Sequence, residues 1–117
     1  MTGFDVFKRC MVLLGYSPES NEVVDNKTLI NRMPDIINQI ALDLKIPQIF
    51  SLSEKININE AKIDALCCGC AMLLALTEGD SGKNQIFTAI YNAKRASVLS
   101  QKAKKEDVLP CVRSGGI

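Results

Sequence analysis

The sequence contains no histidine and no tryptophan, and aromatic residues make up only 5% of its 117 positions. Histidine is the commonest general base near neutral pH and a frequent metal ligand, so its absence removes the usual routes to acid–base catalysis. The acidic residues are scattered, and no pair of carboxylates falls in an apolar setting of the kind that tunes a catalytic acid and base. We therefore expect a protein that is not an enzyme and that binds no cofactor.

An excess of charge of one sign is also missing, because 14 basic and 13 acidic residues leave a net charge of +1. Such a balance does not indicate strong general attraction to nucleic acid or to an acidic membrane. The most apolar run, "ALCCGCAMLLAL" at residues 65–76, is shorter than the roughly 20 residues that a membrane span needs. The first residues, "MTGFDVFKRC", lack the pattern of a secretory signal. We expect an intracellular protein with no membrane partner.

Cysteine is plentiful by contrast, with residues at Cys10, Cys67, Cys68, Cys70 and Cys111. An odd number with three packed into four positions is a poor disulfide framework and suits a reduced compartment. A zinc site needs four ligands, and only the distant Cys10 and Cys111 could complete a set with Cys67 and Cys70. Redox Cys-x-x-Cys motifs lie at helix starts, whereas this one lies inside an apolar helix. Core packing is the favoured interpretation, and a metal or thiol-redox protein is a third hypothesis.

Apolar residues recur at helical spacing in four segments, and no convincing pair of strands is visible. The first predicted helix covers residues 4–14, with Thr2 as its N-cap, Asp5 as partner in a weak capping box and Gly15 at its end. Its apolar side chains should share one face towards the core: Phe4, Phe7, Met11 and Leu14.

The second predicted helix covers residues 27–45, is capped by Asp25 or Asn26, and is stopped by Pro47. Pro34 lies inside its apolar stripe, and a proline there removes a backbone hydrogen bond, so we expect a kink or two closely abutting helices. In the stretch that follows, residues 47–58, apolar and polar residues partly alternate without a partner strand. We expect a connector that pins three side chains onto the helices: Ile49, Phe50 and Leu52.

The third predicted helix covers residues 59–78, with Asn57 as its cap and Glu60 as the capping-box partner. It is apolar almost all round, which predicts the central helix of the fold. Gly69 in its interior costs about 1 kcal/mol relative to alanine. Close approach of a neighbouring helix is the usual reason for such a glycine.

The fourth predicted helix begins at Asp80 or Ser81 and runs to about Lys104. The preceding turn, "GDSGK", fails the phosphate-loop pattern in spacing and context and is interpreted as a helix-capping turn. Because the turn is short, the third and fourth helices should be antiparallel neighbours. The predicted fold is an all-α, four-helix bundle-like domain over residues 1–109 with a long C-terminal hairpin, followed by a flexible tail at 110–117.

Basic residues gather in the C-terminal quarter, where Lys94 and Arg95 lie on the fourth predicted helix. A solvated helix face is the ordinary interpretation of such a cluster. The polar and basic side chains of this helix also allow a helix-turn-helix, although the third helix is too apolar and too long for that motif. A small helical DNA-binding or regulatory protein is therefore the alternative function.

The stretch "CGCAMLLALTEGDSGKNQIFTAIYNAKRA" resembles the C-terminal helical hairpin of the head–tail connector (adaptor) family of tailed bacteriophages, including those of Gram-positive prophages. The resemblance rests on the small-residue apolar helix at 69–76, the acidic turn at 78–80, and the F-x-x-x-Y-N pattern of Phe87, Tyr91 and Asn92. The order of the predicted elements is similar over most of the chain. The cysteine cluster and Pro34 depart from the family pattern.

This resemblance implies a structural protein of the virion, present in the host cytoplasm during assembly. Connectors of this kind form a ring beneath the portal protein and extend the DNA channel. They dock a tail-completion protein and meet passing phage DNA without sequence specificity. A ring needs an interface in which one patch of each subunit meets a different patch of the next. The residues that we predict at that subunit interface are Phe87, Tyr91, Lys94 and Arg95.

Overall fold

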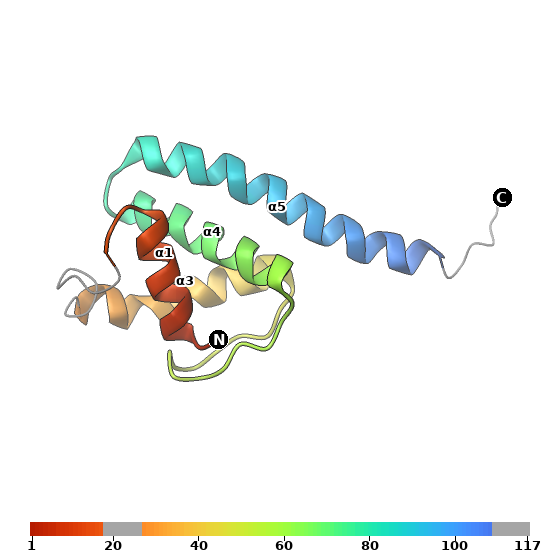
Figure 1. Ribbon diagram of the computed structural model, residues 1–117, viewed down its shortest axis with the longest axis horizontal. Helices are drawn as coiled ribbons and strands as arrows, with labels where there is room; N and C mark the ends of the chain where they lie inside the picture. Colours follow the sequence, from red (N-terminus) through yellow and green to blue (C-terminus); the bar gives the residue numbers. More distant parts are fainter. Residues whose placement is uncertain (18–26, 109–117) are drawn as a thin grey trace.

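The computed structural model describes residues 1–17 and 27–108, with side chains described through residue 100. These residues form the α-helices α1 (Gly3–Leu13), α3 (Lys27–Leu44), α4 (Glu60–Thr77) and α5 (Ser81–Val108) (Figure 1). They contain no strand, only an isolated bridge between Thr2 and Lys55. The predicted all-α, bundle-like fold is confirmed. The predicted caps Asp25 and Asn26, and the predicted tail at 110–117, lie outside the described residues.

Helices α4 and α5 run antiparallel side by side, which confirms the predicted C-terminal hairpin (Figure 1). The hairpin turns at Gly79, whose backbone has a φ of 75°, a left-handed conformation that glycine adopts without steric cost. The end of α5 extends beyond the rest of the bundle (Figure 1). Its last buried side chain within the described residues is Val98. Among the side chains that the structure describes, the bundle therefore holds α5 through about its first five turns.

The N-terminus of α1 has the predicted capping box. The Thr2 hydroxyl accepts from the Asp5 amide at 3.3 Å, and the Asp5 carboxylate accepts from the Thr2 amide at 2.9 Å. The prediction that Phe4 faces the core is wrong, because its side chain is 41% exposed. The backbone of Leu52 lies over Gly3, where an added Cβ would be 2.8 Å from the Leu52 Cα. This close backbone contact covers the first turn of α1 and leaves Phe4 at its edge.

Helix α3 runs through Pro34 as one helix, so the alternative of two abutting helices is not found. It ends at Leu44, and Lys45 has a φ of 60°, so the chain leaves the helix before Pro47. The predicted apolar stripe faces the core, with these residues buried: Leu29, Met33, Ile36, Ile37, Ile40, Ala41 and Leu44.

Helix α4 is the central helix, as predicted, and its interior side chains include Leu66, Cys70 and Leu74, which are fully buried. Its N-cap is Asn59 rather than Asn57, because the Asn59 side chain accepts a hydrogen bond from the Lys62 amide at 2.9 Å. The cap therefore sits immediately before the first helical residue, where its oxygen can reach an amide that has no partner within the helix.

The predicted close approach at Gly69 is confirmed. A Cβ added there would lie 2.8 Å from the Ile40 Cγ2 of α3 and 2.9 Å from the Tyr91 Cε1 of α5. Only a glycine lets both neighbouring helices pack this closely on the same turn of α4. The packing at Gly69 thus sets the relative position of α3, α4 and α5.

Candidate interaction surfaces

The four predicted interface residues lie along α5, and each has contacts within its own chain. Phe87 and Tyr91 are buried. Lys94 pairs with Asp64 of α4, and the Arg95 Nε donates to the Asp43 Oδ2 of α3 at 2.7 Å. These two ion pairs therefore link α5 to α4 and to α3. The side chains of Lys94 and Arg95 stay half-exposed, and their role in a subunit interface stays a prediction.

Asp43 lies between two donors, because the Tyr91 hydroxyl also donates a hydrogen bond to its Oδ2. The bond from Tyr91, aided by Arg95, lowers the pKa of the Asp43 carboxyl. Burial, followed by the bond to Asp43, raises the pKa of the Tyr91 phenol. At neutral pH the carboxylate is thus held ionised and the phenol protonated, which makes this a stable structural contact.

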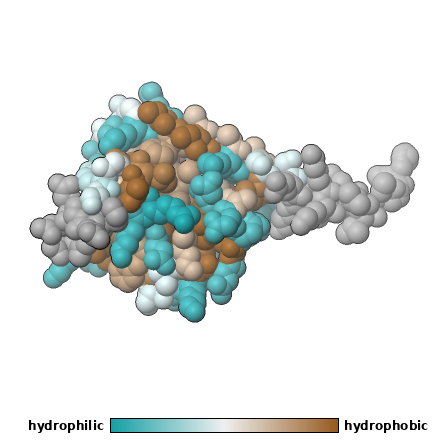
Figure 2. All heavy atoms as spheres, viewed as in Figure 1, coloured by the Kyte–Doolittle hydropathy of each residue, from teal (hydrophilic) through white to brown (hydrophobic). Residues whose placement is uncertain are grey.

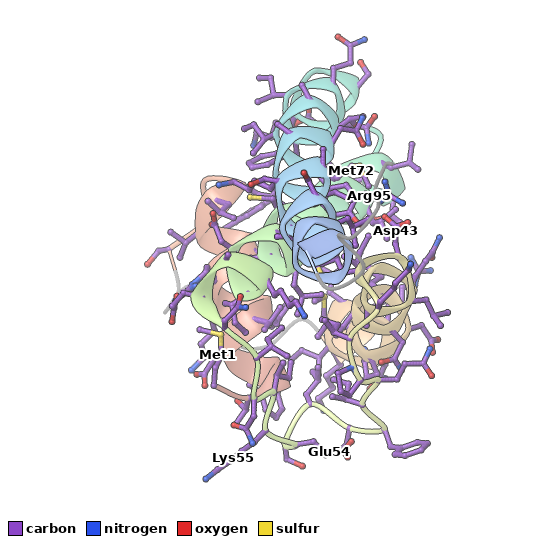
Figure 3. The ribbon with its side chains drawn as sticks, turned by 90° about the vertical axis from the view of Figure 1, so that its right-hand side faces the viewer. Met1, Asp43, Glu54, Lys55, Met72 and Arg95 are labelled. Carbon is purple, nitrogen blue, oxygen red and sulfur yellow. The ribbon has the colours of Figure 1, made fainter. Side chains whose placement is uncertain are left out.

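An open apolar groove lies beside this contact, between α3 and α4 and bounded by Tyr91 of α5. Its volume is about 480 Å³. We call it the α3–α4 groove, and it is lined by Gln39, Ile40, Leu42, Asp43, Met72, Leu73 and Tyr91. Leu42 at its edge is 66% exposed. Viewed along the molecule, Met72, Asp43 and Arg95 lie on the same side (Figure 3). The groove offers an apolar floor with one carboxylate at its edge.

A second apolar surface surrounds residues 49–54, which we call the Phe50 turn. The prediction that Phe50 packs on the helices is wrong, because the side chain is 94% exposed, whereas Ile49 and Leu52 are buried as predicted. A shallow hollow of about 300 Å³ lies next to this ring. It is lined by Phe4, Ile30, Asn31, Pro34, Phe50, Ser51, Leu52 and Ser53.

Hydrogen bonds fix the backbone of the Phe50 turn on both sides of the aromatic residue. The Asn38 side chain of α3 donates to the Ile49 carbonyl at 2.7 Å and accepts from the Ile49 amide at 2.8 Å. The Glu54 carboxylate accepts from the amides of Phe50 and of Ser51, the latter at 2.7 Å. Phe50 points outward because its neighbours are held in place.

Further apolar side chains are exposed on α5. Ile86 is 59% exposed, and Ile90 lies one turn later. Figure 2 shows a hydrophobic stretch over this part of α5, with polar side chains around it. These residues line neither the α3–α4 groove nor the hollow beside Phe50.

The four cysteines in the described part of the chain are free and buried, which confirms core packing for them. The Cys10 thiol donates to the Cys67 carbonyl at 3.2 Å, joining α1 to α4. Burial raises the pKa of Cys10, and the contact with Cys10 followed by burial raises the pKa of Cys67. Both effects disfavour the reactive thiolate. Among the residues that the structure describes, no three Cys, Asp or Glu side chains are placed to hold a metal ion.

Within the described residues, no helix combines the length and the apolar character needed to cross a membrane. Comparison of the chain with protein-family models, with curated proteins and with solved structures gives no match.

Sequence reasoning missed both surfaces. The exposure of Phe50 had one local signal, the Ser51-x-x-Glu54 spacing, which is that of a capping box and indicates a tight turn. The exposure of Leu42 also had a signal, because it lies roughly 200° around the helix from both Ile40 and Leu44 and so falls outside the predicted apolar stripe. The groove itself had none, because its position depends on where α4 and α5 cross α3.

Proposed function

We propose that this protein is a structural virion protein of the head–tail connector type. In this proposal it forms a ring under the portal protein, extends the DNA channel and docks tail-completion proteins, after assembling in the host cytoplasm. One observation carries the proposal: the α3–α4 groove and the hollow beside Phe50 are separate apolar surfaces that share no lining residue among the described residues. Ring closure requires two different surfaces that meet between neighbours.

The exposure of several large apolar side chains supports a role in assembly. Phe50, Leu42 and Ile86 are all more than half exposed, although most apolar side chains in the described part of the chain are buried. Larger apolar patches on a folded domain mark sites of protein–protein contact. Among the described residues, the groove brings no acid, base and nucleophile together, and Asp43 is its one charged lining residue.

The proposal also assigns contacts with the portal protein and with passing DNA. Helix α5 projects beyond the other helices, and in the proposal this projecting end reaches the portal protein (Figure 1). Passing DNA meets Lys94 and Arg95 only weakly, because Asp64 and Asp43 neutralise much of their charge. Such contacts carry no sequence information.

The test is the mass of the purified protein, measured by size exclusion with light scattering over a wide range of concentrations. A single oligomer whose mass stays constant on dilution supports a closed ring. A mass that grows steadily with concentration indicates an open filament and contradicts closure. A monomer at every concentration contradicts ring formation, and salt-dependent binding of that monomer to short DNA duplexes would instead support the alternative of a DNA-binding regulator.

A further inference from the structure

We propose that Cys10 of α1 and Cys67 of α4 form a disulfide when the chain folds in the presence of an oxidising small-molecule disulfide. In the structure both residues are free thiols, so the bond defines a second, oxidised form of the same fold. The inference goes beyond the proposed function and does not depend on it, because it concerns a cross-link between two helices of one chain.

The two cysteines meet where α1 packs against α4 in the core (Figure 1). Both are fully buried, and the Cys10 thiol lies 3.2 Å from the backbone carbonyl oxygen of Cys67. The contact with Cys10 is also the largest cause of the raised pKa of the Cys67 thiol, so the two sulfur groups interact directly. A disulfide joins sulfur atoms about 2 Å apart, so thiols that already interact need only turn towards each other and close a short gap.

The other cysteines of α4 are less suitable partners for Cys67. Residues three apart on a helix have Cβ atoms roughly 5–6 Å apart, more than the roughly 3.5–4.5 Å of a disulfide, so a bond from Cys67 to Cys70 would distort α4. Consecutive side chains of a helix point about 100° apart, which separates Cys67 from Cys68. Cys70 also interacts with the Cys10 thiol, so the experiment has to separate Cys67 from Cys70 as the partner of Cys10.

Burial decides when the bond can form. In the folded, reduced protein neither thiol is exposed, and the raised pKa values of Cys10 and Cys67 keep both protonated. The thiolate is the attacking species in thiol–disulfide exchange, so the folded protein should exchange slowly. Before the chain has folded, the thiols are in contact with solvent and have the pKa of ordinary cysteine, so exchange is faster. The redox conditions during folding are thus retained in the folded protein.

The reaction balances with oxidised glutathione as the oxidant. One cysteine thiolate attacks it, forms a mixed disulfide and releases one glutathione thiolate. The second cysteine thiolate then attacks the first cysteine's sulfur in that mixed disulfide, forms the protein disulfide and releases the second glutathione thiolate. The two cysteines have then lost two protons and two electrons, and one oxidised glutathione has become two molecules of reduced glutathione.

The bond would join residues 57 positions apart in the sequence, with the whole of α3 inside the closed loop. Closing a loop of this length reduces the conformational entropy of the unfolded chain and so stabilises the folded state. The oxidised form should therefore unfold at a higher urea concentration than the reduced form, and a reductant should remove the difference.

The experiment refolds the full chain carrying Cys111→Ser from denaturant in a buffer of oxidised and reduced glutathione. Free thiols are then blocked with N-ethylmaleimide, and two of the four remaining cysteines should escape blocking. Trypsin should release the peptide 10–27 joined to the peptide 63–83, and a reductant should separate them. The same buffer added to the folded, reduced protein should form the bond at least about tenfold more slowly, because exchange has to wait for local opening.

Two matched variants identify the partner of Cys10, because Cys67 and Cys70 are equally buried on α4. In the same background, Cys67→Ala should abolish the joined peptides and Cys70→Ala should retain them. Circular dichroism checks that both variants keep the helical content of the parent chain. Fragmentation of the joined peptides by mass spectrometry also assigns the α4 cysteine in the chain without these two substitutions.

Four blockable thiols after oxidative refolding would overturn the proposal, and so would joined peptides that persist in Cys67→Ala or fragment at Cys70. An oxidised form that unfolds at a lower urea concentration than the reduced form would also overturn it, since the fold would not accommodate the bond. None of these results bears on ring formation, which the mass of the reduced protein tests separately.

Discussion

The Tyr91 hydroxyl of α5 donates a hydrogen bond to the Asp43 carboxylate of α3, across a sequence separation of 48 residues. Arg95, one turn further along α5, donates to the same oxygen at 2.7 Å. Tyr91 also packs against Gly69, where α4 and α5 approach closely. The same residue therefore makes both this close packing contact and the hydrogen bond to Asp43. The contact joins the outer helix of the hairpin to the rest of the bundle and forms one wall of the α3–α4 groove.

Replacing this tyrosine with phenylalanine should change how stability depends on pH. The pKa of Asp43 is lowered on folding, so its contribution is present above pH 4 or so and is lost as the pH falls through the folded pKa. The pKa of Tyr91 is raised, so its contribution is present below about pH 10 and is lost as the pH rises through the folded pKa. Tyr91→Phe should therefore lower the free energy of unfolding by roughly 1–2 kcal/mol at pH 7, and by less at either extreme.

Urea unfolding at a series of pH values measures this difference. The matched control is Tyr16→Phe, which removes the same hydroxyl from an exposed contact with Glu78 at 3.3 Å and should have a smaller effect. Identical pH profiles for the wild type and Tyr91→Phe would show that the contact with Asp43 adds nothing to stability.

Gly69→Ala should destabilise the protein even though alanine is the better helix former. The new methyl group would lie 2.8 Å from Ile40 and 2.9 Å from the Tyr91 ring, and neither contact atom is the end of a flexible side chain. Overpacking of this kind costs about 1–3 kcal/mol, which outweighs the gain in helix propensity of up to about 1 kcal/mol. In the control Gly82→Ala the nearest atom is 3.7 Å away, so that variant should be unchanged or slightly more stable. Thermal unfolding of both variants decides the sign, and a stabilised Gly69→Ala would refute the close packing.

The buried thiols should not react in the folded protein. Cys10, Cys67, Cys68 and Cys70 are buried, and burial raises the pKa of Cys10 and Cys68. In a Cys111→Ser background, titration with a thiol reagent should detect almost no reaction under native conditions and all four thiols in denaturant. One thiol reacting at the rate of a free, solvated cysteine would revive the redox hypothesis for this cluster.

The sequence predicted those features of the fold that depend on neighbours in the chain. The capping box of Thr2 and Asp5, the hairpin turn at Gly79 and the central position of α4 all follow from local pattern. The close packing at Gly69 was predictable too, because a glycine inside an apolar helix commonly marks the approach of a neighbouring element.

The missed features depend on partners distant in the sequence. Nothing near Lys94 or Arg95 indicates that Asp64 and Asp43 are their partners, since each pair forms only after the helices have packed. The apolar character of Phe50 predicts a core position, whereas the hydrogen bonds that the Asn38 amide donates and the Glu54 carboxylate accepts decide which side chains of the turn point inward. Polar contacts of single side chains leave no periodic signal in a sequence.

The basic pair on α5 gives the last prediction. Lys94→Glu combined with Arg95→Glu should weaken assembly, because it places two new negative charges next to Asp64 and Asp43 and leaves excess charge at the edge of the α3–α4 groove. Like charges at an interface oppose association and slow the encounter of subunits. Exposed ion pairs contribute little to folding, so the helical content of the monomer should not change.

A matched control reverses two adjacent exposed basic residues on α1, Lys8→Glu with Arg9→Glu, which alters the net charge equally but away from the groove. Light scattering should show weakened assembly for the α5 variant alone. The exchange Lys94→Glu with Asp64→Lys then restores the ion pair within the chain in reversed order. If the exchange assembles like the wild type while Lys94→Glu does not, Lys94 acts by holding α5 on α4. If both remain weakened, Lys94 contacts the neighbouring subunit. If all these variants assemble normally, neither Lys94 nor Arg95 lies at the subunit interface.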